Sequence, residues 1–165
     1  DLKVQKKHET NYFGDFTWRL MGGYIIGQIP ASNLFDGNGT YRPFTLFAPY
    51  SFATMRTNEF MSNIYAALFL THDFGELLFK FGSFKPQLLL LTNIAFGNLN
   101  HAENHHNYDF KTLNKGYYES GFMVRKILNL NFIDLGLGIM YRYGPYSFDD
   151  QYLNFAYKVS LFYGF

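Results

Sequence analysis

Histidine and acidic side chains gather most densely in one polar segment, within residues 98–114. The residues are His101, Glu103, His105, His106 and Asp109. Imidazole nitrogens and carboxylate oxygens can coordinate zinc. The segment has no helical pattern that would fix the spacing of these ligands, however, and nothing in it indicates a second shell of supporting residues. A hydrated surface loop is therefore the favoured interpretation, and we expect neither a metal nor a cofactor.

Nucleophilic catalysis is not indicated either. A hydrolase needs a nucleophile held by a base and an orienting group, and neither Ser62 nor Ser120 lies in a local motif of that kind. The sequence Gly136-Leu137-Gly138 is not a phosphate-binding loop, because these glycines lie in a strand pattern that no helix follows. We therefore expect a protein that is not an enzyme.

The C-terminal segment carries the clearest structural signal, a two-residue alternation over residues 153–165. One side of it is apolar or aromatic at every position, and the other carries small and polar residues and Lys158. A strand that crosses an outer membrane needs about 9–11 residues of this character, with aromatic residues at the interfaces. The residues expected to face lipid are Tyr157, Val159, Leu161, Tyr163 and Phe165.

The composition supports the same interpretation. Of the 165 residues, 21% are aromatic, including 20 Phe and 14 Tyr, and 16% are charged. A soluble domain has roughly 25% charged residues, and one small core could not bury so many aromatic rings. The sequence has no apolar run of about 18 residues, so a membrane-spanning helix is excluded and alternating strands remain. The net charge of +1, without a concentrated basic patch, argues against a nucleic-acid partner.

Alternation predicts six complete strands and one partial strand. The six ranges are 15–27, 63–73, 87–97, 118–125, 134–143 and 153–165, and Leu2–Val4 would end an earlier strand. In the fifth strand, Leu135, Leu137 and Ile139 are expected to face lipid. The opposite sides carry glycines and charged residues, which are ordinary features of a hydrated barrel interior. The charged residues expected to face inward are Arg19, Glu119, Arg125, Asp134, Arg142 and Lys158.

Loop lengths predict an orientation and the ends of the chain predict its place in a barrel. If the last strand ends at the periplasmic rim, loops 28–59, 98–114 and 144–152 are extracellular, and turns 75–84 and 129–133 are periplasmic. Six strands cannot close, because single-chain bacterial barrels have an even number of strands that starts at eight. The chain begins Asp1-Leu2 without an initiator Met or signal segment. We therefore expect an all-β fold in which residues 1–165 are the C-terminal portion of one antiparallel transmembrane outer-membrane β-barrel domain.

Several segments resemble one bacterial family. The segments are Thr54–Ser62, Tyr65–Gly75, Asp109–Thr112, Lys115–Gly121 and Tyr141–Tyr146. They are similar to Bacteroidetes outer-membrane barrels of unknown function that are often joined to an N-terminal carboxypeptidase-regulatory-like domain. The resemblance covers roughly residues 50–165. It implies a location in the bacterial outer membrane, with membrane lipid and other envelope proteins as partners.

A remoter likeness is to the superfamily of outer-membrane barrel-assembly and translocation proteins. In that superfamily a long extracellular loop tucks into the barrel with an Arg-Gly-aromatic motif, and five strands follow. Arg56 lies in the long loop 28–59 and five predicted strands follow it, although Thr57 replaces the glycine and Asn93 stands where an acid is usual. The resemblance implies that Arg56 anchors the loop in the lumen, with Asn93 or Glu119 as acceptor. A solvated loop arginine with Glu59 as its local partner is an equally weighted alternative.

The expected function follows from these resemblances. The leading hypothesis is a non-enzymatic outer-membrane barrel similar to assembly and translocation pores, with a role in envelope biogenesis. The alternative is a structural or accessory barrel subunit that binds partner proteins in a larger outer-membrane complex. The position of loop 28–59 should discriminate between these two functions.

Overall fold

The computed structural model describes the whole chain except residues 11, 28, 83, 101–110, 131–132 and 164–165. The described part is all-β, with two short 3-10 turns, η1 (Ala31–Asn33) and η3 (Gln151–Asn154). The strands are β1 (Leu2–Thr10), β2 (Gly14–Tyr24), β3 (Phe44–Leu46), β4 (Ile64–Asp73), β5 (Gln87–Asn98), β6 (Tyr117–Leu130), β7 (Ile133–Tyr143) and β8 (Phe155–Tyr163). No helix in the described residues is long and apolar enough to cross a membrane.

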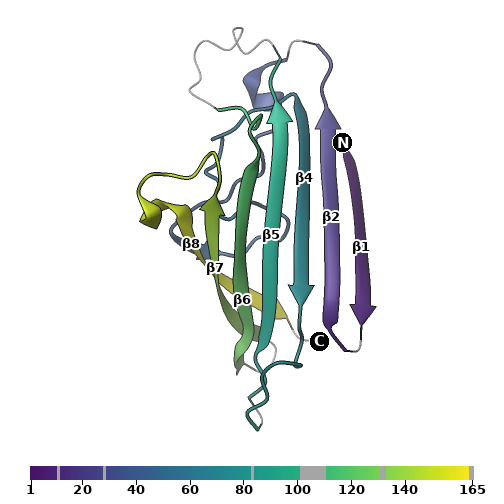
Figure 1. Cartoon of the computed structure of the whole chain (residues 1–165), viewed down its shortest axis with the longest axis vertical. Helices are drawn as coiled ribbons and strands as arrows, with labels where there is room; N and C mark the ends of the chain where they lie inside the picture. Colours follow the sequence, from purple (N-terminus) through teal and green to yellow (C-terminus); the bar gives the residue numbers. More distant parts are fainter. Residues whose placement is uncertain (11, 28, 83, 101–110, 131–132, 164–165) are drawn as a thin grey trace.

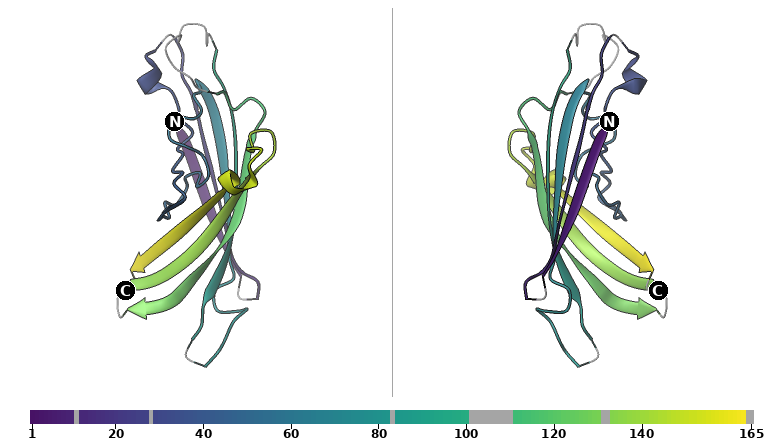
Figure 2. Two further views of the ribbon diagram at one scale, coloured as in Figure 1. Left: turned by 90° about the vertical axis from the view of Figure 1, so that its left-hand side faces the viewer. Right: turned by 90° about the vertical axis from the view of Figure 1, so that its right-hand side faces the viewer.

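The strands form one eight-stranded sheet in the order β1-β2-β4-β5-β6-β7-β8-β3 (Figure 1). Successive long strands pair antiparallel, whereas β3 pairs parallel with β8. The sheet is strongly curved, and β7 and β8 swing toward one side of it (Figure 2). β1 and β3 lie at its two edges, so the sheet is open and is not closed into a barrel.

Two features of the sheet differ from the six strands that the sequence predicts. Leu2–Thr10 is a complete strand in register with β2, from Leu2 opposite Gly22 to Thr10 opposite Gly14. Its second half reads Lys6-Lys7-His8-Glu9 and gives no apolar alternation, so backbone pairing with β2 defines it. β3 lies inside the predicted loop 28–59 and has only three residues, which is too short for a periodic signal.

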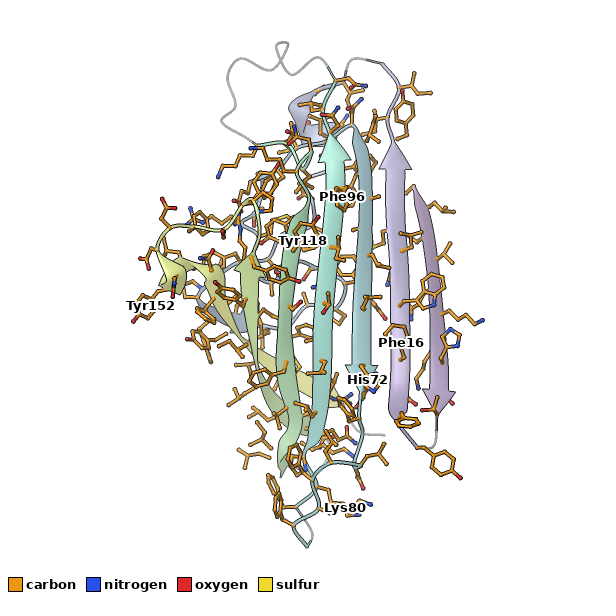
Figure 3. The ribbon with its side chains drawn as sticks, in the orientation of Figure 1. Phe16, His72, Lys80, Phe96, Tyr118 and Tyr152 are labelled. Atoms are coloured by element: carbon orange, nitrogen blue, oxygen red, sulfur yellow. The ribbon has the colours of Figure 1, made fainter. Side chains whose placement is uncertain are left out.

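The two faces of the sheet differ in exposure, because one is open and the other is covered by a loop. On one face, which we call the outer face, large apolar side chains are exposed, including Phe122 at 48%, Leu137 at 47%, Tyr157 at 50% and Leu161 at 49%. Figure 3 shows side chains of this face, with Phe16, Phe96 and Tyr118 among them. The predicted outward residues Leu135, Ile139 and Val159 lie on the same side and are partly exposed. The side chain of Tyr163 and the whole of Phe165 lie outside the described part.

The opposite face, which we call the inner face, is covered by residues 34–62. We call this segment the inner loop, and Figure 2 shows it on the side toward which β7 and β8 curve. Its buried residues include Phe52 and Met55, which pack with Phe69 of β4 and Tyr117 of β6. The core of the described structure therefore lies between the sheet and its own inner loop.

Candidate functional site: the seat of the inner loop

The carboxylate of Glu119 is the centre of the contact between sheet and inner loop. Its Oε1 accepts hydrogen bonds from the backbone N–H of Ala53 (2.9 Å) and from Asn93 Nδ2 (2.7 Å). Its Oε2 accepts from the backbone N–H of Thr54 (2.8 Å) and from Thr54 Oγ1 (2.6 Å). Glu119 is completely buried. A buried carboxylate with four donors fixes the loop to β5 and β6 at one point, because hydrogen bonds to a charged acceptor are the strong ones.

Strand alternation creates this arrangement on the sheet side. Asn93 of β5 and Glu119 of β6 are directly opposite each other in the antiparallel register, and adjacent cross-strand side chains on one face are close enough to interact. Tyr117 lies two residues before Glu119 and so shares its face. The Tyr117 Oη and Thr54 Oγ1 atoms are 2.7 Å apart, so one loop threonine contacts both inward side chains.

A second polar contact joins β7 to the loop. Arg142 donates from Nη1 to Glu59 Oε2 (3.1 Å) and from Nη2 to Glu59 Oε1 (2.8 Å). The guanidinium is fully buried and lies over the rings of Tyr117 (4.8 Å) and Phe148 (4.5 Å). A planar guanidinium can bind a carboxylate with two parallel bonds and stack on aromatic rings at once. Arg142 therefore holds the loop in position and in orientation.

We call the contacts of Glu119 and Arg142 with the loop the seat of the inner loop. Smaller contacts join the loop to other parts of the inner face. Lys158 of β8 donates from Nζ to the carbonyl oxygen of Thr40 (3.0 Å) and is 1% exposed. Glycine lets the loop approach the sheet at Gly23, where an added Cβ would lie 2.2 Å from Cζ of Phe35. Phe35 in turn stacks on Tyr65 with ring centroids 5.8 Å apart. Gly23, one of the inward glycines predicted for a hydrated interior, thus makes room for the loop.

The loop does not fill the inner face completely. A cavity of about 210 Å³ lies between the sheet residues Phe69, Leu91 and Arg125 and the loop residues Phe47 and Tyr50. Its lining is largely apolar and presents no cluster of catalytic groups. The cavity shows that the inner loop rests on the sheet at discrete contacts and is not packed against it everywhere.

The structure places the predicted anchor residues differently from the expectation. Asn93 and Glu119 lie together on the inner face and contact the loop, but Arg56 does not reach them. The prediction for Arg56 is wrong: its side chain is exposed, and its guanidinium lies over the rings of Phe148 (4.8 Å) and Tyr41 (5.8 Å). The cause is a tight turn, in which Glu59 N–H donates to the carbonyl of Arg56 and Asn58 has φ 58°. That turn leaves residues 56–58 outside and buries the residues on both sides.

No sequence motif marks the residues that hold the loop. Thr54 and Glu59 have no local motif, and their partners are 65 and 83 positions away in the chain. The other inward charges are on the inner face as expected: Arg125 pairs with Asp73 at 3.1 Å, and Arg19 lies 4.1 Å over the ring of Tyr50. The inward positions of Arg142, Asp134 and Lys158 could be predicted, because each is a charged residue on the side of its strand opposite the apolar residues.

The other candidate chemistry gains no geometry from the structure. The histidine and acidic cluster, His101, Glu103, His105, His106 and Asp109, lies outside the described residues. Among the residues that are described, no group of three or more His, Cys, Asp or Glu could hold a metal ion. Ser120 is on the outer face, where the hydrogen-bond partners seen in the described part of the chain are the hydroxyl groups of Thr92 (3.1 Å) and Tyr143 (3.0 Å) and not a histidine or carboxylate. The contacts at Glu119 and Arg142 therefore hold a segment of chain on the sheet, and the described residues around them include no set of groups arranged for bond making.

Comparisons with protein-family models, with curated proteins and with solved structures found no match.

Proposed function

We propose that this chain forms part of the wall of a transmembrane β-barrel in a bacterial outer membrane, with the outer face in lipid and the inner loop controlling the interior. One observation carries the proposal: the outer face exposes large apolar side chains, whereas charged side chains are buried beneath the inner loop. Glu119 and Arg142 are fully buried and Lys158 nearly so, whereas Phe122, Leu137, Tyr157 and Leu161 are about half exposed. Such an arrangement is stable when the exposed side contacts hydrocarbon.

The continuity of the outer face supports this proposal. Its positions on β4, β5, β7 and β8 carry no Asp, Glu, Lys or Arg. Soluble monomers rarely expose contiguous apolar patches of more than a few hundred Å². Charged side chains on a lipid-facing strand cost about 2–4 kcal/mol near the bilayer midplane, so their absence from these positions is the pattern that a membrane selects.

The assembly and translocation type of barrel is the leading form of the proposal. The inner loop packs on the inner face, and five long strands, β4 to β8, follow it, as in the superfamily to which the sequence has a remote likeness. The function would then be non-enzymatic, with the loop as a plug whose release opens the interior. Arg56 does not support this assignment, because its exposed position removes the motif that linked the two.

An accessory barrel that binds other envelope proteins is the second candidate. The specific observation in its favour is the exposed turn at Arg56, Thr57 and Asn58, which presents polar and charged groups outside the seat. The uncharacterised Bacteroidetes family, which the sequence resembles, is compatible with either role. The two candidates differ in what the inner loop does when its anchors are weakened.

Uptake of a membrane-impermeant dye by intact cells tests the plug. Cells that produce the Glu119→Gln variant should take up the dye faster than cells with the unaltered protein, whereas Arg56→Ala should change nothing. Equal uptake in all three strains would reject the plug. If Arg56→Ala or Asn58→Ala instead reduced co-purification of envelope proteins, the accessory role would replace it.

A further inference from the structure

The edge of β8 is occupied by β3 in an unusual way. β3 belongs to the inner loop and runs parallel to β8, with Phe44, Thr45 and Leu46 opposite Tyr157, Lys158 and Val159. Tyr157 N–H donates to the carbonyl of Pro43 (2.9 Å), and Val159 O accepts from Phe47 N–H (2.7 Å). β8 runs from Phe155 to Tyr163, so the register of β3 covers only the middle of this edge.

The directions of the strands decide what else can lie at that edge. Every step from β1 to β8 through the long strands is antiparallel, and there are six such steps. β1 and β8 therefore run in the same direction, as Figure 1 shows. If β1 came directly beside β8, within the chain or from a second copy turned about an axis along the strands, the pair would be parallel. Antiparallel closure needs an odd number of further strands between them.

β3 cannot be the first of these further strands, because it runs in the same direction as β8. An antiparallel strand at the β8 edge would use the backbone groups of Tyr157 and Val159 that β3 now uses. Backbone groups alternate in direction along a strand, so Leu161, two residues further, presents its groups to the same edge beyond the reach of β3. The edge thus has a short occupant and room for a longer one.

We propose that the edge of β8, which β3 covers only in part, is a docking site for an antiparallel β-strand, and that β3 occupies this site until the strand displaces it. The proposal rests on the proposed membrane location, since an unpaired edge is most costly in lipid. The incoming strand should alternate like β7, with apolar residues on the outer side and small or polar residues on the inner side. Because β3 is part of the inner loop, its displacement would also pull on Thr40, which binds Lys158.

Cysteine cross-linking can test this, since the chain has no cysteine of its own. Leu46→Cys with Val159→Cys reports β3 on β8, because paired strands are about 4.8 Å apart and disulfides form at Cα separations of about 4.4–6.8 Å. The matched control is Leu137→Cys with Val159→Cys, which shares one cysteine and joins register partners of β7 and β8. The probe is a synthetic peptide with the β7 sequence, IDLGLGIMYRY, added to purified protein in detergent micelles.

The proposal predicts that both pairs cross-link without peptide. The β7 peptide should lower the yield of the β3–β8 disulfide several-fold and leave the β7–β8 disulfide unchanged. A peptide with proline in place of Leu137 should have no effect, because proline cannot donate to a ladder. A β3–β8 pair that fails to cross-link, a yield that the peptide does not change, or an equal fall in both pairs would overturn the proposal. Micelles make this result independent of the bilayer test of the proposed function.

Discussion

Replacement of Glu119 by Gln is the sharpest test of how the inner loop is held. The carboxylate accepts two hydrogen bonds on each oxygen, all between 2.6 and 2.9 Å. In Gln one oxygen becomes an NH2 group, which faces the backbone N–H of Ala53 or of Thr54 whichever way the amide turns. That charge-assisted bond, which contributes about 1.5–3 kcal/mol, is lost, and the other three become neutral bonds that contribute about 0.5–1.5 kcal/mol each. The loss is therefore about 3–6 kcal/mol for loop seating, and relaxation of the site favours the lower value.

The expected effect is a large increase in loop opening. Since every 1.4 kcal/mol is a factor of ten, a loss of about 3 kcal/mol raises the open population by about 100-fold. Ser51→Cys supplies an isosteric reporter that is 6% exposed in the inner loop. Its rate of reaction with a maleimide follows the open population when opening and closing are fast relative to labelling.

The control is Glu76→Gln in the same reporter background. Glu76 is a carboxylate in the connection between β4 and β5 that is 39% exposed and pairs with Lys85 and Lys126, away from the inner loop. Exposed pairs contribute about 0–1 kcal/mol, so the labelling rate should change by less than about fivefold. Far-UV circular dichroism should show that the sheet persists in both variants. A Glu119→Gln rate within about threefold of the control would refute the reasoning, because desolvation of the carboxylate would then offset its hydrogen bonds.

Three further predictions follow from other contacts. Arg142→Leu should raise the same labelling rate strongly, since breaking a buried ion pair costs about 3–5 kcal/mol. Arg56→Ala should change the labelling rate no more than Arg42→Ala does. Equal effects of the Arg142 and Arg56 substitutions would contradict the assignment of Arg142 as the anchor. Gly23→Ala should destabilise the loop by about 1–3 kcal/mol through overpacking against Phe35, and a double-mutant cycle with Phe35→Ala should remove most of that cost; additive effects would place the clash elsewhere. Leu137→Arg should cost about 2–4 kcal/mol in denaturant unfolding from lipid vesicles, whereas Leu78→Arg, at nearly equal exposure in the connection between β4 and β5, should cost little; equal costs would argue against lipid at the outer face.

The alternation of apolar and polar residues in the sequence predicts six of the strands, β2 and β4 to β8, and the two faces of the sheet. A period of two places every second residue on one side, so the outward positions of Leu137 and Tyr157 and the inward positions of Glu119 and Lys158 could be assigned without coordinates. The pattern predicted only the first residues of β1, Leu2–Val4, and did not predict β3, because the second half of β1 is polar and β3 has three residues. These two strands are defined by backbone hydrogen bonds to β2 and β8. Side-chain periodicity does not show such backbone pairing.

The loop residues that contact the inner face could not be predicted from the sequence, because their partners are distant in the chain. The sequence predicted a tucked loop and named Asn93 and Glu119 as acceptors, but it assigned the contact to Arg56 by resemblance. In the structure Arg56 lies in an exposed turn, and the backbone N–H groups of Ala53 and Thr54 donate to Glu119 instead. Backbone N–H groups exist at nearly every residue, so no sequence pattern marks the two that a carboxylate will bind. The contact of Arg142 with Glu59 joins residues 83 positions apart in the chain, so it likewise depends on how the loop folds onto the sheet.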